Sequence, residues 1–494
     1  MKIVLINLKS DDIRENDFPL GLAYIAEELK ENDLRIFDFN IEYQENNFYE
    51  YLFSDVIAIV GISVCTEYFD AAIKVARSIK NFSPKTIVIF GGHHVTFEYR
   101  NVLENHIEVD VCVIGEGENS IKKIAHALEE NQVIDFVNIN HIAFRDSQNQ
   151  VIVNNVKNID NVEIKIPRRD TFVNSKKNLT NLSTSRGCTH SCDFCGLNTN
   201  HEKRIKCINL EYVEKDIENI CKDSLIDTLY ITDPNFLAFE SHFLGVISII
   251  KKFSNISFFK ISSRADTLLK QKEHIEYVLK SGCNAIELGI ESLSQDQLDR
   301  FNKGISKNVN IEAIEFLKEL QKSYEFELIL ELILFDPYVM TNELLESIDF
   351  LCENGFSNPV QEQWIFPGLK LFPGTKLREK TINDKLALNI VNGLPYWKYY
   401  YEEMAFVSSF IKRFQYFILP NILEIRTYFN KLTDVIPRIG FKLMKSINYL
   451  NSVSFFYIKD ILYCKGDLAK SKEVYNIYDL KIKECINIIK LYVR

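Results

Sequence analysis

The chain has 494 residues, of which 46% are hydrophobic and 26% are charged. That is ordinary globular composition, with length for two to four domains, so folding does not require disulfides. The formal net charge is −10, which argues against a protein that coats nucleic acid.

The amino terminus, MKIVLINLKS, does not have the shape of a signal peptide, and no run of about 18 apolar residues follows it. We therefore expect a cytoplasmic protein without a membrane span, in which the eleven cysteines stay reduced. Eight cysteines sit singly and are expected to be packing residues. The other three lie close together.

Residues 1–135 alternate strand and helix patterns, which predicts a doubly wound parallel sheet. The expected strands are Ile3–Leu8, Leu34–Phe39, Val56–Val64, Thr86–Phe90 and Val109–Ile114. Ligands of such sheets bind beyond the carboxyl ends of the strands. Ser63, Gly91-Gly92 and Gly115-Glu116-Gly117 lie at those ends, either to admit a ligand to bare backbone or to form tight left-handed turns.

The remaining chain divides into three parts. Residues 136–177 predict a hairpin and a linker. Residues 178–375 contain six strand candidates, which favour a partial (β/α)6 barrel of the TIM type over a second open sheet, although periodicity alone does not decide. These candidates are Leu179–Ser185, Thr228–Thr232, Ile256–Ser262, Ala285–Ile290, Phe326–Phe335 and Gln361–Phe366. The pattern of residues 376–494 is helical and rich in aromatics. We expect these aromatics to form either a packed helical core or a cap that faces a substrate.

Three cysteines lie in the segment TSRGCTHSCDFC, with the spacing CxxxCxxC: Cys188, Cys192 and Cys195. Soft thiolates select zinc or an iron–sulfur cluster. A zinc site would need His190 or His201 as its fourth ligand. However, zinc sites usually take their ligands from two CxxC-type pairs that are separated in the sequence. A [4Fe–4S] cluster takes four ligands, so three cysteines leave one iron open to a small molecule.

This loop, with Phe194 before its third cysteine, resembles the signature of the radical S-adenosylmethionine (SAM) superfamily. The resemblance implies a [4Fe–4S] cluster on the three cysteines and SAM on the open iron, where reduction yields a 5′-deoxyadenosyl radical. Similar strand ends in the family hold SAM, and here they carry Asp233, Ser262, Arg264, Glu291 and Ser292; Phe194 is also expected at SAM.

Among these positions, Arg264 is expected to bind the SAM carboxylate, because a guanidinium pairs carboxylates bidentately. The resemblance places Glu291 and Ser292, in the sequence GIES, near the amino group or the ribose. The alternative for each is a barrel-top hydrogen bond or ion pair without any ligand.

Residues 1–135 resemble the cobalamin-binding domain of cobalamin-dependent radical SAM enzymes. The matching positions are Leu20, Gly21, Ser63, Gly91, Gly92, Gly115, Glu116 and Gly117. A DxHxxG loop with a cobalt-ligating histidine is absent, and Asp11, Asp12 and Arg14 stand in its place. The resemblance therefore implies cobalamin without a histidine on its lower face, with His93 and His94 as loop residues near the corrin.

The resemblance implies a cobalamin-dependent methyltransferase that uses the cluster and SAM to act on an unactivated carbon of a small-molecule or peptide-derived substrate. An electron donor such as flavodoxin or ferredoxin would reduce it; further catalytic residues are not identified. Three alternatives stay open. They are a cyclase or oxidoreductase that keeps cobalamin, a plain radical SAM oxidoreductase with a remnant first domain, and a non-catalytic metal-binding protein.

Overall fold

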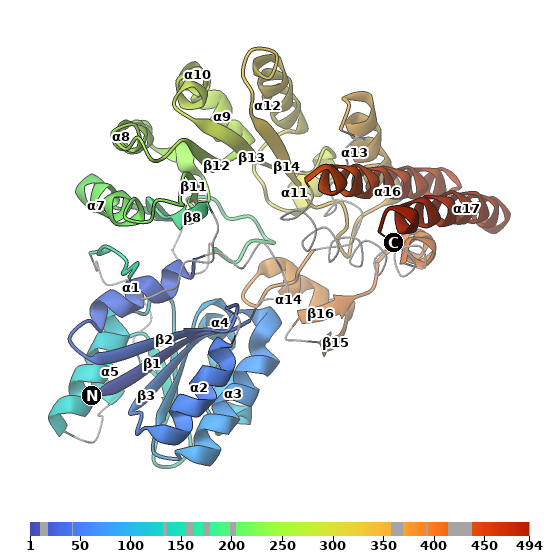
Figure 1. The fold of residues 1–494 in the computed structure, drawn as a ribbon. Coiled ribbons are helices and arrows are strands. Elements are labelled where there is room, and N and C mark those ends of the chain that lie inside the picture. The colour runs from blue at the N-terminus through green and yellow to red at the C-terminus, as the bar shows by residue number, and fades with distance from the viewer. Residues whose placement is uncertain are drawn as a thin grey trace.

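A computed structural model describes residues 1–9, 18–41, 43–131, 136–154, 163–170, 178–197, 204–356, 369–391, 394–412 and 437–493. The chain forms two lobes, an N-terminal sheet domain and a curved sheet ringed by helices, with two long C-terminal helices beside the second lobe (Figure 1). The loop predicted at Asp11, Asp12 and Arg14 lies outside the described residues.

The first lobe contains a seven-stranded sheet in the order β2-β1-β3-β4-β5-β6-β7. Its strands are β1 (Lys2–Asn7), β2 (Asp33–Asp38), β3 (Ile59–Ser63), β4 (Ile87–Gly91), β5 (Val111–Val113), β6 (Ile142–Arg145) and β7 (Val151–Val153). The first five strands run parallel. Strands β1, β3, β4 and β5 have near-continuous apolar sequences and are largely buried, as is typical of a parallel sheet covered on both faces, whereas the edge strand β2 is partly exposed.

Helices cover both faces of this sheet, which confirms the doubly wound architecture. Side chains from α1 (Leu20–Glu28) and α5 (Glu118–Asn131) pack on one face. Side chains from α2 (Gln44–Ser54), α3 (Phe69–Phe82) and α4 (His93–Asn105) pack on the other.

The hairpin of β6 and β7 belongs to this sheet, whereas the sequence placed it in a connecting segment over residues 136–177. Strand β6 pairs antiparallel with β5, and β7 pairs antiparallel with β6. The reason is burial: Ile142 and Phe144 pack into the core beneath the sheet edge. The sheet therefore continues to residue 153.

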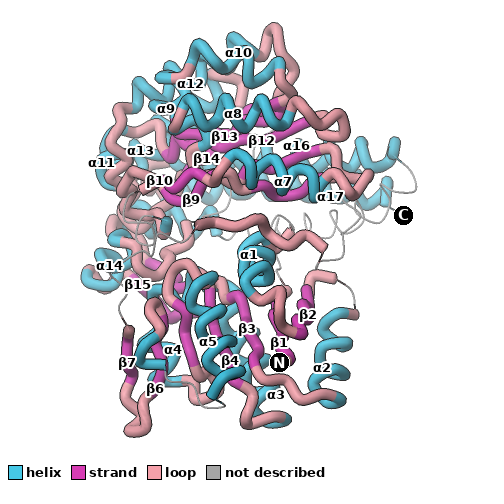
Figure 2. Tube along the Cα trace, turned by 90° about the vertical axis from the view of Figure 1, so that its left-hand side faces the viewer, coloured by secondary structure: helices cyan, strands magenta, loops and turns pink. Residues whose placement is uncertain are grey.

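The second lobe contains a five-stranded parallel sheet in the order β14-β13-β12-β11-β8. Its strands are β8 (Leu179–Leu182), β11 (Thr228–Ile231), β12 (Phe258–Arg264), β13 (Cys283–Glu291) and β14 (Glu327–Leu332). The main outer helices are α7 (Leu210–Ile220), α8 (Glu240–Ile250), α10 (Lys272–Lys280), α12 (Lys307–Leu320) and α13 (Thr341–Glu353), and they follow the outside of the curve (Figures 1 and 2). This agrees with the partial barrel; the sixth expected strand, residues 361–366, lies outside the described residues.

The first predicted barrel strand divides in two. Strand β8 ends at Leu182, and the chain continues as β9 (Ser185–Gly187), which pairs antiparallel with β10 (Ile205–Cys207). The buried carboxylate of Asp233 accepts hydrogen bonds from the Thr184 backbone and hydroxyl and from the Ser185 hydroxyl. These bonds hold the chain at the point where it leaves the sheet.

The C-terminal part is mostly helical but contains a hairpin that the sequence did not predict. After α14 (Lys376–Asn383), β15 (Ala387–Val391) and β16 (Leu394–Trp397) pair antiparallel. A helix over residues 402–412 follows, and then α16 (Pro437–Tyr463) and α17 (Leu468–Val493). In the described residues, no helix is long and apolar enough to cross a membrane.

The aromatic tail packs onto the barrel. Phe455 and Tyr457 are fully buried, and the Tyr457 hydroxyl donates to the Phe410 carbonyl. Lys459 pairs with Asp349 at 2.7 Å and so joins α16 to α13. Phe406, Phe410, Phe455, Tyr457 and Tyr478 therefore serve as helical core, whereas Tyr400, Tyr401, Phe456 and Tyr463 are exposed. Phe414, Tyr416 and Phe417 lie outside the described residues.

Candidate functional site

A cavity of about 360 Å³ lies at the carboxyl ends of the parallel strands of the first lobe, and we call it the strand-end cavity. Its wall includes all eight residues that the sequence placed around cobalamin: Leu20, Gly21, Ser63, Gly91, Gly92, Gly115, Glu116 and Gly117. His93 and His94 are absent from the described wall, and His94 is almost fully buried against Phe69.

Three glycines of this wall, Gly21, Gly91 and Gly115, leave open space where a larger residue would place its side chain, whereas Gly92 and Gly117 are closely packed. A Cβ atom built on Gly21 or Gly91 would meet no heavy atom within 4 Å. Gly115 has a φ of +75°, a conformation that favours glycine. At Gly61, by contrast, a Cβ would lie 2.8 Å from Leu5, so that glycine serves strand packing. The wall is therefore open where the sequence places Gly21, Gly91 and Gly115.

The second lobe contributes to the same cavity. Ser183 and Arg186, from the segment that leads into the three cysteines, complete the wall. Arg186 pairs with Glu118 at 2.7 Å and with Glu116 at 3.2 Å. The sequence did not identify Arg186, because its partners lie about 70 residues earlier in the chain.

The three cysteines lie in a loop of residues 188–196, which we call the cysteine loop. Cys192 is buried, and Cys188 and Cys195 are half-buried. Burial raises the pKa of Cys192 and raises that of Cys195 to about 11, so metal binding there must displace protons.

Other parts of the second lobe fix the shape of the cysteine loop. The Asp193 amide donates to the Phe301 carbonyl, and the Asp193 carbonyl accepts from the Leu377 amide at the start of α14. Asn302 donates to the Ser191 carbonyl and to the Asp193 carboxylate. Phe194 stacks edge-on against Phe301 at 5.3 Å and packs there as a core residue.

No three His, Cys, Asp or Glu side chains among the described residues converge on a single metal ion. His190, one candidate for the fourth ligand of a zinc site, lies in the cysteine loop, and His201, the other candidate, lies outside the described residues.

Charged side chains converge beside Cys192 at the carboxyl ends of β12 and β13. Arg264 Nη1 lies 3.6 Å from Cys192 Sγ, and its other nitrogens donate to Asp266 and to the Lys303 carbonyl. Lys303 Nζ donates to Glu291 at 2.8 Å. Lys303 is only 3% exposed, and sequence reasoning missed it.

Glu291 stands on an unusual backbone. Its φ is +60°, and the register with β14 shifts between Gly289 and Glu291. Such strain in a residue other than glycine often accompanies function. A Cβ at Gly289 would come within 3.2 Å of Glu291 Oε1 and 3.5 Å of Lys303 Nζ, so the glycine makes room for this ion pair.

The side chains of two residues expected at SAM form hydrogen bonds with other protein groups. Ser292 is fully buried and donates to Gln297 Oε1, while accepting from the Ser294 amide. Asp233 is 1% exposed and is occupied by Thr184 and Ser185, as described above. Sequence pattern placed both at strand ends correctly but could not show that protein groups already satisfy them.

Ser262 faces the barrel interior two residues before Arg264. Its hydroxyl donates to Glu287 Oε2 at 2.6 Å, and the Tyr230 hydroxyl donates to the same oxygen at 2.8 Å. Ser262 is therefore part of a polar cluster one step below the strand ends.

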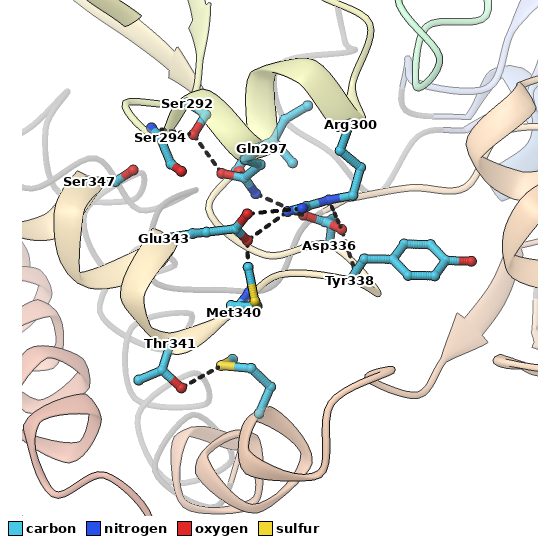
Figure 3. Close-up of polar contacts among 12 residues, drawn as sticks. Ser292, Ser294, Gln297, Arg300, Asp336, Tyr338, Met340, Thr341, Glu343 and Ser347 are labelled. Atoms are coloured by element: carbon cyan, nitrogen blue, oxygen red, sulfur yellow. Dashed lines mark hydrogen bonds and ion pairs between the residues drawn. The ribbon is translucent and has the colours of Figure 1, made fainter.

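The network around Ser292 locks the ends of β13 and β14 together (Figure 3). Arg300 lies between Asp336 and Glu343, with Nη2 3.0 Å from the first carboxylate and 2.8 Å from the second. Neither carboxylate is exposed. Gln297 links Ser292 to Asp336. These contacts stabilise the strand ends that carry Glu291.

Comparison with known proteins agrees with the division of the chain into a sheet domain and a partial barrel. The B12 binding domain family matches residues 13–125, and the radical SAM superfamily matches residues 182–356. The chain belongs to the cobalamin-dependent radical SAM enzymes. Membership implies a [4Fe–4S] cluster, SAM and cobalamin as cofactors. The donor set of three thiolates and the open, glycine-lined cavity both fit these groups.

Relatives of this chain are named for more than one reaction. It is 27% identical over 319 residues to an uncharacterized methyltransferase of Pyrococcus horikoshii, covering 61% of this chain and 66% of that protein. It is 24% identical to the hopanoid C-3 methylase of Methylococcus capsulatus, covering 61% and 59%. It is also 24% identical to the anaerobic magnesium-protoporphyrin IX monomethyl ester cyclase of Cereibacter sphaeroides, covering 54% and 44%. The chain thus spans less than two thirds of each.

The fold is also that of a solved structure. The radical enzyme OxsB, with aqua-cobalamin and SAM bound, superposes with a TM-score of 0.79 at 17% sequence identity, covering 99% of this chain and 80% of that one. At this identity the match shows the fold alone. It supports the expected order of sheet domain, partial barrel and helical tail.

Proposed function

We propose that this enzyme is a cobalamin-dependent methyltransferase that alkylates an unactivated carbon of a small-molecule or peptide-derived substrate. One observation carries the proposal: residues of the cysteine-bearing lobe complete the wall of the strand-end cavity. A corrinoid in that cavity would border the segment that leads into the cysteine loop. When bound, the cluster supplies the electron that cleaves SAM, and cobalamin carries the methyl group.

The chain's own residues then have distinct roles. Cys188, Cys192 and Cys195 would hold the cluster, and the open wall with Gly21 and Gly91 would receive the corrinoid. Arg264 lies against Cys192, the Glu291–Lys303 pair stands at the end of the neighbouring strand β13, and both would orient SAM. The Arg264 guanidinium already donates to Asp266, Cys192 and the Lys303 carbonyl. We therefore assign it two roles, the positioning of Cys192 and the orientation of SAM.

The names of two relatives, an uncharacterized methyltransferase and a hopanoid methylase, support methyl transfer. The enzyme would receive electrons from a small carrier such as flavodoxin or ferredoxin. Its thiols and radical chemistry suit the reducing cytoplasm. A dry site between the two lobes would keep the radical from water.

A second candidate keeps both cofactors but omits methyl transfer, as a cyclase or oxidoreductase. The match to a cyclase favours this candidate. The two separate by product analysis: methyl transfer yields S-adenosylhomocysteine together with 5′-deoxyadenosine, whereas the second candidate yields 5′-deoxyadenosine alone.

The test uses anaerobically reconstituted enzyme with hydroxocobalamin and a low-potential reductant, SAM labelled with deuterium on its methyl group, and a metabolite extract of the source organism. We expect mass spectrometry to find a metabolite that acquires the label. Label that stays in SAM while 5′-deoxyadenosine accumulates would overturn methyl transfer and favour the second candidate. The Cys192→Ala variant is the control, since neither product should form without the cluster.

A further inference from the structure

The N-terminal domain holds the cysteine loop at both ends. Arg186, two residues before the first cysteine, pairs with carboxylates in residues 116–118. Gly196, one residue after the third cysteine, lies against His93, which directly follows Gly92. Both of these N-terminal loops also line the strand-end cavity.

The contact at the first end is a nearly enclosed ion pair. Arg186 is 17% exposed, Glu116 is 22% exposed and Glu118 is 14% exposed. The guanidinium also lies over the Tyr24 ring, 4.5 Å from its centroid. Charge-assisted bonds of this kind, shielded from water, resist displacement and fix the geometry of the guanidinium. The chain entering the cysteine loop is therefore tied to the cavity wall.

The contact at the second end depends on a glycine. A Cβ atom at Gly196 would overlap the His93 ring, and His93 also hydrogen-bonds the Gly196 backbone. The same ring packs edge-on against Phe97 at 5.1 Å and against Phe372 at 5.7 Å. His93 is thus held between Phe97 of its own helix α4 and two other segments of the chain, at Gly196 and Phe372.

We propose that Arg186 and His93 are positioning residues that couple occupancy of the strand-end cavity by a corrinoid to ordering of the cysteine loop. The inference rests on the proposed function only in taking a corrinoid as the occupant. A ligand that fills the cavity restrains residues 115–118 and 91–93, and these restrain the two ends of the loop. Because linkage is reciprocal, a formed cluster should tighten corrinoid binding by the same factor.

Hydrogen exchange tests this without catalysis. The whole chain is prepared without its cluster, and exchange of amides in residues 188–196 is followed with and without hydroxocobalamin. We expect hydroxocobalamin to slow this exchange about tenfold. Arg186→Met should lose most of the effect, and His93→Ala should lose it chiefly near Gly196. Lys370→Met is the matched control, because it removes another pair with the N-terminal domain, to Glu67, and should keep the full effect.

The outcomes separate this inference from the proposed function. If absorbance shows that hydroxocobalamin binds but exchange in the loop is unchanged, the coupling is wrong and the proposed function stands. If hydroxocobalamin does not bind, both are wrong. If circular dichroism shows that Arg186→Met does not fold, Glu118→Gln tests the same ion pair from its other side. Full protection in Glu118→Gln would overturn the role of that pair.

Discussion

Lys303 and Glu291 form an ion pair of 2.8 Å beside the cysteine loop, and their side chains are only 3% and 13% exposed. Removing one partner of such a pair leaves an uncompensated buried charge. We predict that Lys303→Met lowers the free energy of unfolding by about 3 kcal/mol. Urea denaturation of the cofactor-free protein measures this.

The double variant Lys303→Met with Glu291→Gln is the matched control for this prediction. It removes both charges, so its loss of stability should be clearly smaller than that of Lys303→Met alone. Equal losses in the two variants would mean that side-chain packing, and not charge pairing, is what Lys303 contributes.

Filling the strand-end cavity should impair corrinoid binding without unfolding the domain. Gly21 lies in helix α1, and its Cβ position is open. Leucine is a good helix former, so Gly21→Leu should not lower the melting temperature. We predict binding of hydroxocobalamin weakened at least about tenfold, which absorbance titration measures.

Lys123→Leu provides the comparison for that substitution, since it adds the same side chain to an exposed position of α5 outside the cavity wall. Its binding should equal that of the unaltered protein. Undiminished binding in Gly21→Leu would show that the corrinoid lies elsewhere.

Iron content tests the assignment of the cysteines. Anaerobically reconstituted protein should contain about four iron atoms per chain, and Ala at position 188, 192 or 195 should remove most of them. Cys207→Ser, on strand β10, should retain full iron because its thiol lies outside the cysteine loop. Zinc in place of iron in the unaltered protein would contradict the assignment.

Stability should depend on pH through His94. The side chain is 3% exposed, and burial, with positive Arg378 nearby, lowers its pKa to about 4. Below the ordinary pKa of 6.5 the unfolded chain takes up a proton that the folded protein excludes, so stability falls as the pH falls toward 4. The full loss from this group is about 3 kcal/mol.

His94→Gln should flatten this part of the pH dependence, as measured by urea denaturation between pH 7 and pH 4.5. His126→Gln, which changes an exposed histidine, is the matched control. An unchanged slope in His94→Gln would assign the pH dependence to other groups.

Strand and helix patterns predicted most of this architecture, because long buried strands such as β1 and β3 have near-continuous apolar sequences. The glycines at the strand ends also predicted the cavity wall, since backbone that meets a ligand leaves a local mark in the sequence. The hairpin of β6 and β7 was visible too, but its pairing with β5 depends on a tertiary edge that no local pattern shows.

Residues that act across the fold escaped prediction. Arg186 and Glu116 lie about 70 residues apart, and Lys303 lies 12 residues after Glu291 in a turn without a motif. Ser292 and Asp233 show a different limit of sequence patterns. Both stand at strand ends, yet neighbouring donors and acceptors already satisfy their side chains. Only the three-dimensional arrangement shows whether a polar side chain already has hydrogen-bond partners within the protein.

The central claim is that one chain brings a corrinoid cavity and a SAM-cleaving cluster together for methyl transfer. Product analysis of the anaerobically reduced protein tests it most directly, with SAM supplied and hydroxocobalamin either present or absent. We predict that the unaltered protein forms 5′-deoxyadenosine and that Cys192→Ala does not. We also predict that S-adenosylhomocysteine forms only with hydroxocobalamin and that Gly21→Leu forms less of it. Formation of S-adenosylhomocysteine at the same rate without any corrinoid, or its absence in every condition, would contradict the account.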